Sequence, residues 1–272
     1  SGLFNMITGP GPVVGDEVAA NPGTQAVGFI GSTETGQKVA ARAAGKTILL
    51  EMGGNGPMVI LDDADLEAAA EASLTSAFLG AGQSCTAGER FLVHERVYDA
   101  YLDGLGSAIE GGIKLGDPFD PMTTLGPLNN EPTADKMDQH ISDALEGGAE
   151  LVSGGARAEG FPTNLYDHPT VLGKVTGEMR VSREETFGPI VPATVISDEE
   201  EAIRAVNSSP YGLLSAVFTR DLARGLRFAE AVRTGWVNIN ASSNHWESHL
   251  PFGGRAGSRS GIGRVGGRYA ME

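Results

Sequence analysis

The residue best suited to covalent chemistry in this sequence is its single cysteine. Cys85 follows Gln83 and Ser84 in a turn where a predicted helix ends. The thiolate of a cysteine is a strong nucleophile, and backbone N–H groups at such a turn can lower the pKa of the thiol. A lone cysteine is also often no more than a small buried apolar side chain. The residue by itself leaves both interpretations open.

A second candidate is the carboxylate of Glu51. Glu51 ends an apolar run at residues 47–51 that predicts a strand, and Gly53 and Gly54 follow it. Burying a carboxylate at a strand end costs free energy unless the group is paired, and it raises the pKa toward the range of a general base. A strand-terminal glutamate that points to water is the alternative.

The two segments belong to a longer pattern. Glu51-Met-Gly-Gly stands 34 positions (85 − 51) before the cysteine of Phe78-Leu-Gly-Ala-Gly-Gln-Ser-Cys85. Three further blocks accompany them: Phe-Ile-Gly-Ser-Thr-Glu-Thr-Gly at residues 29–36, Glu-Glu-Thr-Phe-Gly-Pro at residues 184–189, and Pro-Phe-Gly-Gly at residues 251–254 with Ser-Gly-Ile-Gly-Arg at residues 260–264. This set of blocks, in this order, resembles the aldehyde dehydrogenase superfamily.

The resemblance implies that the protein oxidises an aldehyde in two stages. Cys85 would attack the aldehyde carbon to give a thiohemiacetal, with its own backbone N–H as one oxyanion donor. Hydride transfer to NAD or NADP would leave a thioester, which water activated by Glu51 would hydrolyse to the acid. Some members of the family release the acyl group to coenzyme A instead. A third interpretation is that the chain is a folded fragment without catalytic activity.

The resemblance also implies a set of cofactor-binding residues. They are Gly31, Ser32, Thr33, Glu34, Thr35 and Gly36 in the turn after the first strand, together with Glu185 and Phe187. Gly31 would let the backbone approach the pyrophosphate, and Ser32 stands where a helix start favours anions. Glu185 would bond the nicotinamide ribose, and Phe187 would pack by the ring. The choice between NAD and NADP stays open.

The aldehyde entrance is assigned by the resemblance to Phe252 and to a variable loop that carries His245 and Trp246. The run His245-Trp-Glu-Ser-His lacks the spacing of a His-Glu-x-x-His zinc site, so we expect no metal. Asn55 and Met52 stand where the family often carries Lys and Leu. Asn55 therefore leaves the substrate subgroup open.

The composition of the chain limits the classes of partner that it could bind. The 272 residues carry a formal net charge of −15, and so acidic a surface repels the phosphate backbone of nucleic acids. One cysteine allows no intrachain disulfide, which fits a reducing cytoplasm, and no apolar run approaches the roughly 20 residues of a membrane span. We expect a small-molecule aldehyde as partner, and the resemblance implies that the parent enzyme is a homo-oligomer.

Strands and helices alternate along the chain, which predicts an α/β fold. We expect strands at residues 27–30, 47–51, 58–61, 90–94, 190–196, 214–219 and 236–240, and helices at residues 37–44, 62–78, 97–109 and 133–146. Asp62 or Asp63 should cap the second of these helices. Ser197 and Glu200 should form a capping box for a helix after the 190–196 strand.

The resemblance implies a three-layer catalytic domain of the aldehyde dehydrogenase type at residues 53–257. Residues 1–52 would form part of a Rossmann-like cofactor-binding domain, because two strands and one helix are too few for a complete one. Residues 258–272 would return toward that domain. The family's second oxyanion donor and its lysine for the adenosine ribose have no counterpart here, so the isolated chain could be inactive.

Overall fold

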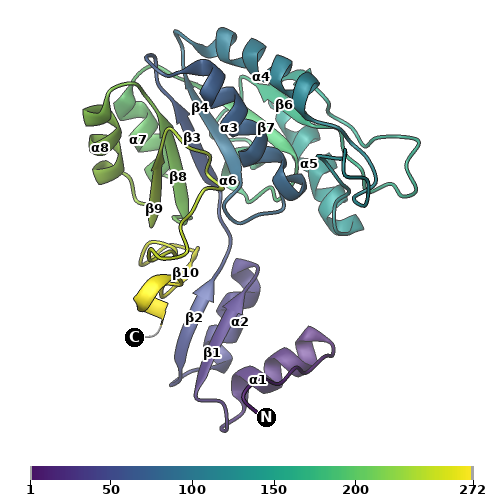
Figure 1. Ribbon diagram of the computed structural model, residues 1–272, viewed down its shortest axis with the longest axis vertical. Coiled ribbons are helices and arrows are strands. Elements are labelled where there is room, and N and C mark those ends of the chain that lie inside the picture. Colours follow the sequence, from purple (N-terminus) through teal and green to yellow (C-terminus); the bar gives the residue numbers. More distant parts are fainter. Residues whose placement is uncertain (1, 271–272) are drawn as a thin grey trace.

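The largest element of the fold is a seven-stranded sheet, seen in a computed structural model that describes residues 2–270 (Figure 1). Its strands are β3 (Gly56–Ile60), β4 (Gly88–His94), β5 (Glu150–Ser153), β6 (Thr170–Gly173), β7 (Ile190–Ile196), β8 (Leu214–Phe218) and β9 (Trp236–Ile239). Their order is β5-β6-β7-β4-β3-β8-β9. Only the pair of β5 and β6 is antiparallel. The predicted α/β class is confirmed.

Helices cover both faces of this sheet and give three layers. One face carries α3 (Leu66–Phe78), α4 (Tyr98–Gly112) and α5 (Glu131–Glu146), and the other carries α7 (Glu199–Asn207) and α8 (Leu222–Ala231). Side chains alternate along a strand, so Met58 and Ile60 of β3 join the core under α3, α4 and α5. Val59 between them joins Phe228 of α8 in the other core. Burial on both faces explains why the central strands are continuous apolar runs.

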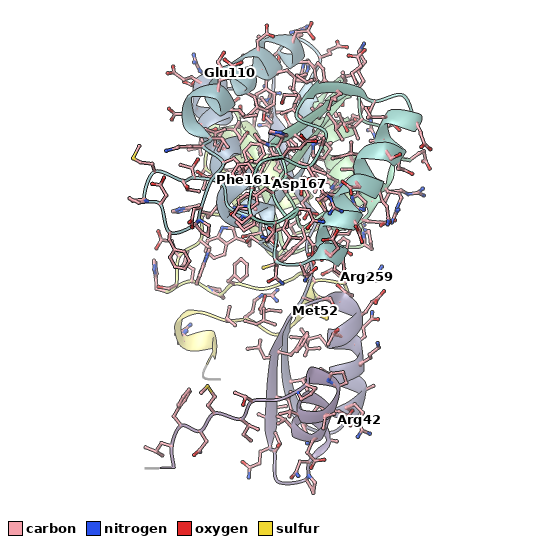
Figure 2. All side chains as sticks on the ribbon, turned by 90° about the vertical axis from the view of Figure 1, so that its right-hand side faces the viewer. Arg42, Met52, Glu110, Phe161, Asp167 and Arg259 are labelled. Atoms are coloured by element: carbon pink, nitrogen blue, oxygen red, sulfur yellow. The ribbon has the colours of Figure 1, made fainter. Side chains whose placement is uncertain are left out.

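A second, three-stranded sheet lies beside the first. Its strands β1 (Ala26–Ile30) and β2 (Thr47–Glu51) are parallel and connected through α2 (Thr33–Arg42), while β10 (Gly261–Ile262) runs antiparallel to β2. The late segment thus returns to an early strand (Figure 1). Met52 and Arg259 lie at the junction between the two sheets (Figure 2). The assignment of residues 1–52 to cofactor binding stays a prediction.

The start of α3 differs from the prediction. Asp65, not Asp62 or Asp63, is the cap, and its Oδ1 accepts a hydrogen bond from the Ala68 N–H at 3.2 Å. Asp62 and Asp63 instead form ion pairs with Arg224 at 2.9 and 2.8 Å. Arg224 belongs to α8, far along the chain. The sequence around Asp62 and Asp63 therefore could not reveal that these carboxylates bind Arg224 instead of capping α3.

The cap of α7 is displaced by one residue from the predicted capping box. Asp198 is the cap, and its side chain accepts a hydrogen bond from the Glu201 N–H at 2.7 Å. Glu201, rather than Glu200, accepts the hydrogen bond from the Ser197 N–H at 2.7 Å. The acidic run after Ser197 offered several equivalent carboxylates, which made the register ambiguous.

The two sheets meet at the ends of their strands. Ile30 and Glu51 are the last residues of β1 and β2, while Cys85 and Phe187 shortly precede β4 and β7. The carboxyl edge of the small sheet therefore faces the amino edge of the large one (Figure 1). Between residues 2 and 270, no helix has both the length and the apolar character needed to cross a bilayer.

Candidate functional site

A cavity of about 560 Å³ lies where the edges of the two sheets meet. It is lined by Ile30, Gly31, Ser32, Glu51, Met52, Gly53, Gln83, Ser84, Cys85, Lys136, Glu185 and Phe187. Six residues predicted from the sequence are thus brought together: Gly31, Ser32, Glu51, Cys85, Glu185 and Phe187. Residues from four separate segments of the chain converge here, which favours a binding site.

The turn that presents Cys85 has an unusual backbone. Gly80, Ala81 and Gly82 all have positive φ angles, of 59°, 58° and 71°, which turn the chain sharply after α3. Gln83 braces the turn, because its Nε2 donates to the Gly80 carbonyl at 3.0 Å and its Oε1 accepts from the Asn129 N–H at 2.8 Å. The nucleophile candidate therefore stands on a tightly held turn.

Two glycines let the chain pass between this turn and the segment at residues 184–187. A Cβ on Gly53 would lie 2.8 Å from Glu185 Oε2, and a Cβ on Gly54 would overlap the Cys85 carbonyl oxygen. A larger residue at Gly54 would force the backbone of Cys85 away, and one at Gly53 would displace the carboxylate of Glu185. The pair of glycines after Glu51 is therefore a packing requirement of the site.

Glu51 is buried, and its surroundings raise its pKa. The side chain is 5% exposed, and neither carboxylate oxygen has a hydrogen-bond partner within residues 2–270. Burial raises the pKa of Glu51 to about 7, and the positive charge of Arg264 partly opposes the rise. The shift has the direction that the sequence predicted. A carboxyl group that titrates near neutral pH can take up a proton from water.

The thiol of Cys85 behaves differently from the expectation. The sequence suggested that backbone N–H groups would lower its pKa, but burial, and next the negative charges of Glu185 and Glu51, raise it to about 11. The hydrogen bond from its own backbone N–H lowers the pKa only partly. The expectation was wrong because burial of the thiol, together with the carboxylates that the fold brings to it, outweighs the backbone N–H.

This environment predicts slow alkylation of Cys85 at neutral pH. In the folded chain, the rate with iodoacetamide should rise about tenfold per pH unit from about pH 7 to pH 10 without a plateau. Glu185→Gln and Glu51→Gln should each increase the rate at a fixed pH, because each removes a negative charge. The chain unfolded in urea is the control and should react faster at neutral pH. A plateau near pH 8.5 in the folded chain would contradict the prediction.

Glu185 presents a carboxylate to the cavity. Its Oε1 accepts a hydrogen bond from the Gly54 N–H at 2.9 Å, and its backbone carbonyl accepts one from Lys136 Nζ at 3.3 Å. Lys136 lies on α5 and was missed, as was Gln83 as a lining residue. Gln83 belongs to the motif at residues 78–85 that contains Cys85. No signal in the sequence singled out Lys136 from the other polar residues of its helix.

The turn after β1 is only partly in the cavity. Gly31 and Ser32 line it, and the Ser32 side chain caps α2 by accepting a hydrogen bond from the Thr35 N–H at 3.3 Å. Thr33 is buried and donates its hydroxyl to the Arg259 carbonyl at 2.9 Å. The helix starts at Thr33, earlier than the predicted residue 37.

Three other residues predicted for the cofactor, Glu34, Thr35 and Gly36, belong to the first turn of α2 and are not among the lining residues. Gly36 packs against the side chain of Met52, where a Cβ would overlap its sulfur atom. The structure thus gives Gly36 a packing reason of its own, and the cofactor role of these three residues stays a prediction.

Of the three residues predicted for the aldehyde entrance, Phe252 lies next to Cys85, and none of the three lines the cavity. Phe252 is buried with Leu213 and Leu214, and Cys85 packs against this cluster. The Trp246 ring lies 5.8 Å from that of Phe252, centroid to centroid. The more exposed His245 pairs with Glu247 in the same loop at 3.7 Å. Within residues 2–270, no three His, Cys, Asp or Glu side chains are grouped so as to hold a metal ion.

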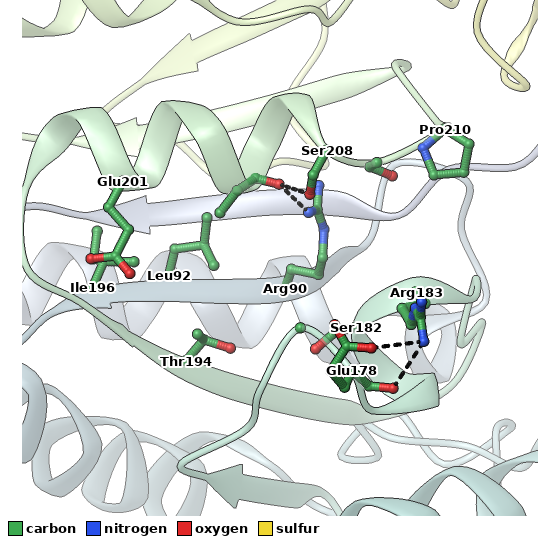
Figure 3. Close-up of a pocket in the computed structure, with 13 residues that line it drawn as sticks. Arg90, Leu92, Glu178, Ser182, Arg183, Thr194, Ile196, Glu201, Ser208 and Pro210 are labelled. Atoms are coloured by element: carbon green, nitrogen blue, oxygen red, sulfur yellow. Dashed lines mark hydrogen bonds and ion pairs between the residues drawn. The ribbon is translucent and has the colours of Figure 1, made fainter.

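A second cavity, of about 570 Å³, lies beside β4 and α7 (Figure 3). Its lining includes Arg90, Leu92, Arg183, Thr194 and Ile196. None of the residues predicted from the sequence lines it. Of these two cavities, only the first is lined by site residues that the sequence predicted.

Comparison with known proteins shows the family to which the chain belongs. The model of the aldehyde dehydrogenase family matches residues 1–272. The chain is 40% identical to succinate-semialdehyde dehydrogenase (NADP(+)) of Escherichia coli strain K12, over all of this chain and 56% of that protein. It is 39% identical to glutarate-semialdehyde dehydrogenase of Pseudomonas aeruginosa, over all of this chain and 55% of that protein. The chain thus spans about half the length of these curated relatives.

Solved structures with the same fold include an NADP-dependent enzyme of E. coli, with a TM-score of 0.95 and 39% identity over all of this chain and 56% of that one. Glyceraldehyde-3-phosphate dehydrogenase from Methanocaldococcus jannaschii, complexed with NADP, has a TM-score of 0.92 and 36% identity over 98% of this chain and 57% of that one. Betaine aldehyde dehydrogenase from Staphylococcus aureus, in complex with NAD+, has a TM-score of 0.91 and 35% identity over 97% and 54%. This chain belongs to the aldehyde dehydrogenase family.

Proposed function

We propose that the protein to which this chain belongs oxidises an aldehyde to a carboxylic acid with NAD+ or NADP+, using Cys85 as nucleophile and Glu51 as general base. The observation that carries the proposal is that one cavity brings together the single thiol and a buried carboxyl group with a pKa of about 7. A nucleophile and a base in one cavity are the parts that covalent acyl transfer needs.

The residues of the chain take the following steps. The Cys85 thiol adds to the aldehyde: Sγ bonds to the aldehyde carbon, and the thiol proton passes to the carbonyl oxygen to give a thiohemiacetal. Departure of a hydride from that carbon, to the acceptor that an oxidised nicotinamide cofactor would supply, and of the hydroxyl proton to solvent then leaves an acyl group on Sγ as a thioester. Glu51 takes a proton from a water molecule as that water attacks the acyl carbon. The C–S bond breaks, the acid leaves and Cys85 regains a proton. Two moderate barriers replace one high barrier.

The cavity also fits a dinucleotide. Ser32 and the start of α2 offer N–H groups and a helix dipole that suit a phosphate. In the part of the chain that the structure describes, Glu185 Oε1 bonds the Gly54 N–H while Oε2 has no hydrogen-bond partner, which suits a ribose hydroxyl. When bound, an oxidised nicotinamide cofactor supplies the hydride acceptor and a positive ring charge. Relatives solved with NADP and with NAD+ support either choice.

We further infer that a small aldehyde enters past Phe252, Trp246 and His245. The semialdehydes in the names of two relatives make such compounds the first substrates to test. A reducing cytoplasm suits the single free thiol. Assembly of the parent enzyme as a homo-oligomer and the absence of a nucleic-acid partner are also retained as proposals.

The proposed function is tested by following NAD(P)H absorbance. Succinate semialdehyde, glutarate semialdehyde, betaine aldehyde and propanal are offered with NAD+ and with NADP+, both to this chain and to a chain that also carries an upstream segment of the kind its relatives have. We expect NAD(P)H from the extended chain with at least one aldehyde. No NAD(P)H from any pair, with Cys85 intact and the chain folded, would overturn the assignment to oxidation.

A further inference from the structure

Glu89 is a buried carboxylate that the proposed reaction does not use. It lies on β4, four residues after Cys85, and is only 2% exposed. In its ionised form, a buried carboxyl group costs free energy unless it is paired or hydrogen-bonded. Its hydrogen-bond partners therefore indicate what it does.

Both oxygens of Glu89 bind one short stretch of backbone. Oε2 accepts a hydrogen bond from the Thr186 N–H at 2.8 Å, and Oε1 accepts one from the Phe187 N–H at 2.7 Å. Phe187 has a φ of +57°, a left-handed conformation that side chains other than glycine rarely adopt. The carboxylate thus holds a backbone conformation that would otherwise be disfavoured.

The same stretch is held from a second side by Asn55. Asn55 Nδ2 donates to the Glu184 carbonyl at 3.1 Å and lies 3.5 Å from Glu89 Oε2. The backbone carbonyl of Asn55 in turn accepts a hydrogen bond from Arg90 Nε at 3.1 Å. Arg90 is fixed at its other end, where its Nη1 donates to the Ala205 carbonyl at 2.8 Å (Figure 3). Neighbouring residues of β4 therefore anchor the stretch, one directly and one through Asn55.

The stretch that these bonds hold contains both predicted nicotinamide contacts. Glu185 and Phe187 flank Thr186 and line the cavity with Cys85. A shift of the Thr186 and Phe187 amides would move both side chains relative to the thiol. Catalytic geometry depends on placement at this scale.

We propose that Glu89 is a positioning residue, whose carboxylate clamps the Thr186 and Phe187 amides and so sets Glu185 and Phe187 against the cavity that holds Cys85. The proposal rests on the proposed function for its catalytic consequence. The clamp itself concerns backbone geometry and can be measured without any cofactor.

Two variants of similar side-chain length separate hydrogen bonding from filling of space. Glu89→Gln keeps one acceptor and sets an NH₂ group against the other amide, while Glu89→Met removes both acceptors. Tyr101→Phe is the control for a general loss of stability, because it removes a buried hydrogen bond to Ser73 of 2.7 Å in the core under α3 and α4. Tyr101 does not line the cavity.

The first measurement is amide hydrogen exchange of this chain without ligands. We expect exchange at Thr186 and Phe187 to accelerate about tenfold in Glu89→Gln and further in Glu89→Met. Tyr101→Phe should leave these two amides unchanged relative to the rest of the chain. Wild-type protection of both amides in the folded Gln and Met variants would overturn the proposal.

The second measurement uses the extended chain. If Glu89 positions the cofactor contacts, Glu89→Gln should raise KM for NAD(P)+ about tenfold, change KM for the aldehyde much less, and lower kcat. A merely structural glutamate would reduce the amount of active enzyme and leave KM unchanged. Loss of the clamp in exchange while the wild type forms no NAD(P)H would reject the proposed function alone; unchanged KM and unchanged exchange in an active enzyme would reject the clamp alone.

Discussion

Replacement of Cys85 by serine is expected to reduce aldehyde oxidation by the extended chain roughly 10⁴-fold or more, because a serine hydroxyl is a far weaker nucleophile and would give an ester instead of a thioester. The shapes of the two side chains are similar, and Cys85 packs against the cluster of Leu213, Leu214 and Phe252. The fold should therefore survive. The rate of NAD(P)H formation with saturating aldehyde measures the effect.

Ser84→Ala is the matched control for Cys85→Ser. Ser84 lines the same cavity and its hydroxyl contacts Thr86 at 2.9 Å, so its removal disturbs the same turn. We expect this control to retain activity within about tenfold, since it removes two partly buried hydrogen bonds, both to Thr86. Equal losses in the two variants would indicate that the turn, rather than the thiol, is what matters.

The second large effect is expected from Glu51→Gln. The amide cannot take a proton from water, so the acyl group should remain on Cys85 and steady-state turnover should fall by about 10²–10⁴-fold. One rapid equivalent of NAD(P)H per site should precede the slow phase. Mass spectrometry of the quenched protein should find the acyl mass on the peptide that contains Cys85.

The pH profile adds a test of the same role. Because burial raises the pKa of Glu51 to about 7, hydrolysis of the thioester in the wild type should increase as the pH rises through about 7 and then level off. The sign follows from the base being active only in its ionised form. Glu51→Gln should abolish this rise. The profile is measured in the slow phase after the first turnover.

Glu51→Gln also separates hydrolysis from transfer to coenzyme A. Transfer of the acyl group to coenzyme A uses no water molecule, so it needs no base to activate one. An enzyme that releases the acyl group to coenzyme A should therefore keep its turnover in the variant when coenzyme A is present. Undiminished turnover of that kind would replace the hydrolytic assignment. Burial of the carboxyl group beside the thiol favours hydrolysis, because a raised carboxyl pKa is useful mainly for proton transfer.

The parts of the fold that were predicted from the sequence have strong local signals. The bounds of β2 and β7 agree with the predicted strands, because each is an apolar run with clear ends. The elements that were not predicted include β5, β6 and α8. Strands β5 and β6 have four residues each, and β5 is mostly exposed, so neither shows a long periodic pattern. The third, α8, was missed although Asp221 caps it.

The site shows a similar division between local and distant causes. The positions of Cys85 and Glu51 could be taken from motifs, and the raised pKa of Glu51 followed from its place at the end of a buried strand. The raised pKa of Cys85 was not predicted, because burial of the thiol in the fold is its first cause and Glu185, the second, lies 100 positions away in the sequence (185 − 85). The role proposed for Glu89 was equally hidden, since its partners Thr186 and Phe187 are brought to β4 only by the fold.

The meeting of the two sheets has a consequence for protein engineering. Glu51 is the last residue of β2 in the small sheet, whereas Cys85 precedes β4 in the large one. A chimaera that exchanges β1, α2 and β2 with a relative, in order to change cofactor preference, would import the relative's base together with its cofactor turn. Such a graft would have to retain Gly53 and Gly54, because the graft boundary passes between Glu185 and the backbone of Cys85. The proposed base and the proposed cofactor turn would therefore be exchanged as one unit in this architecture.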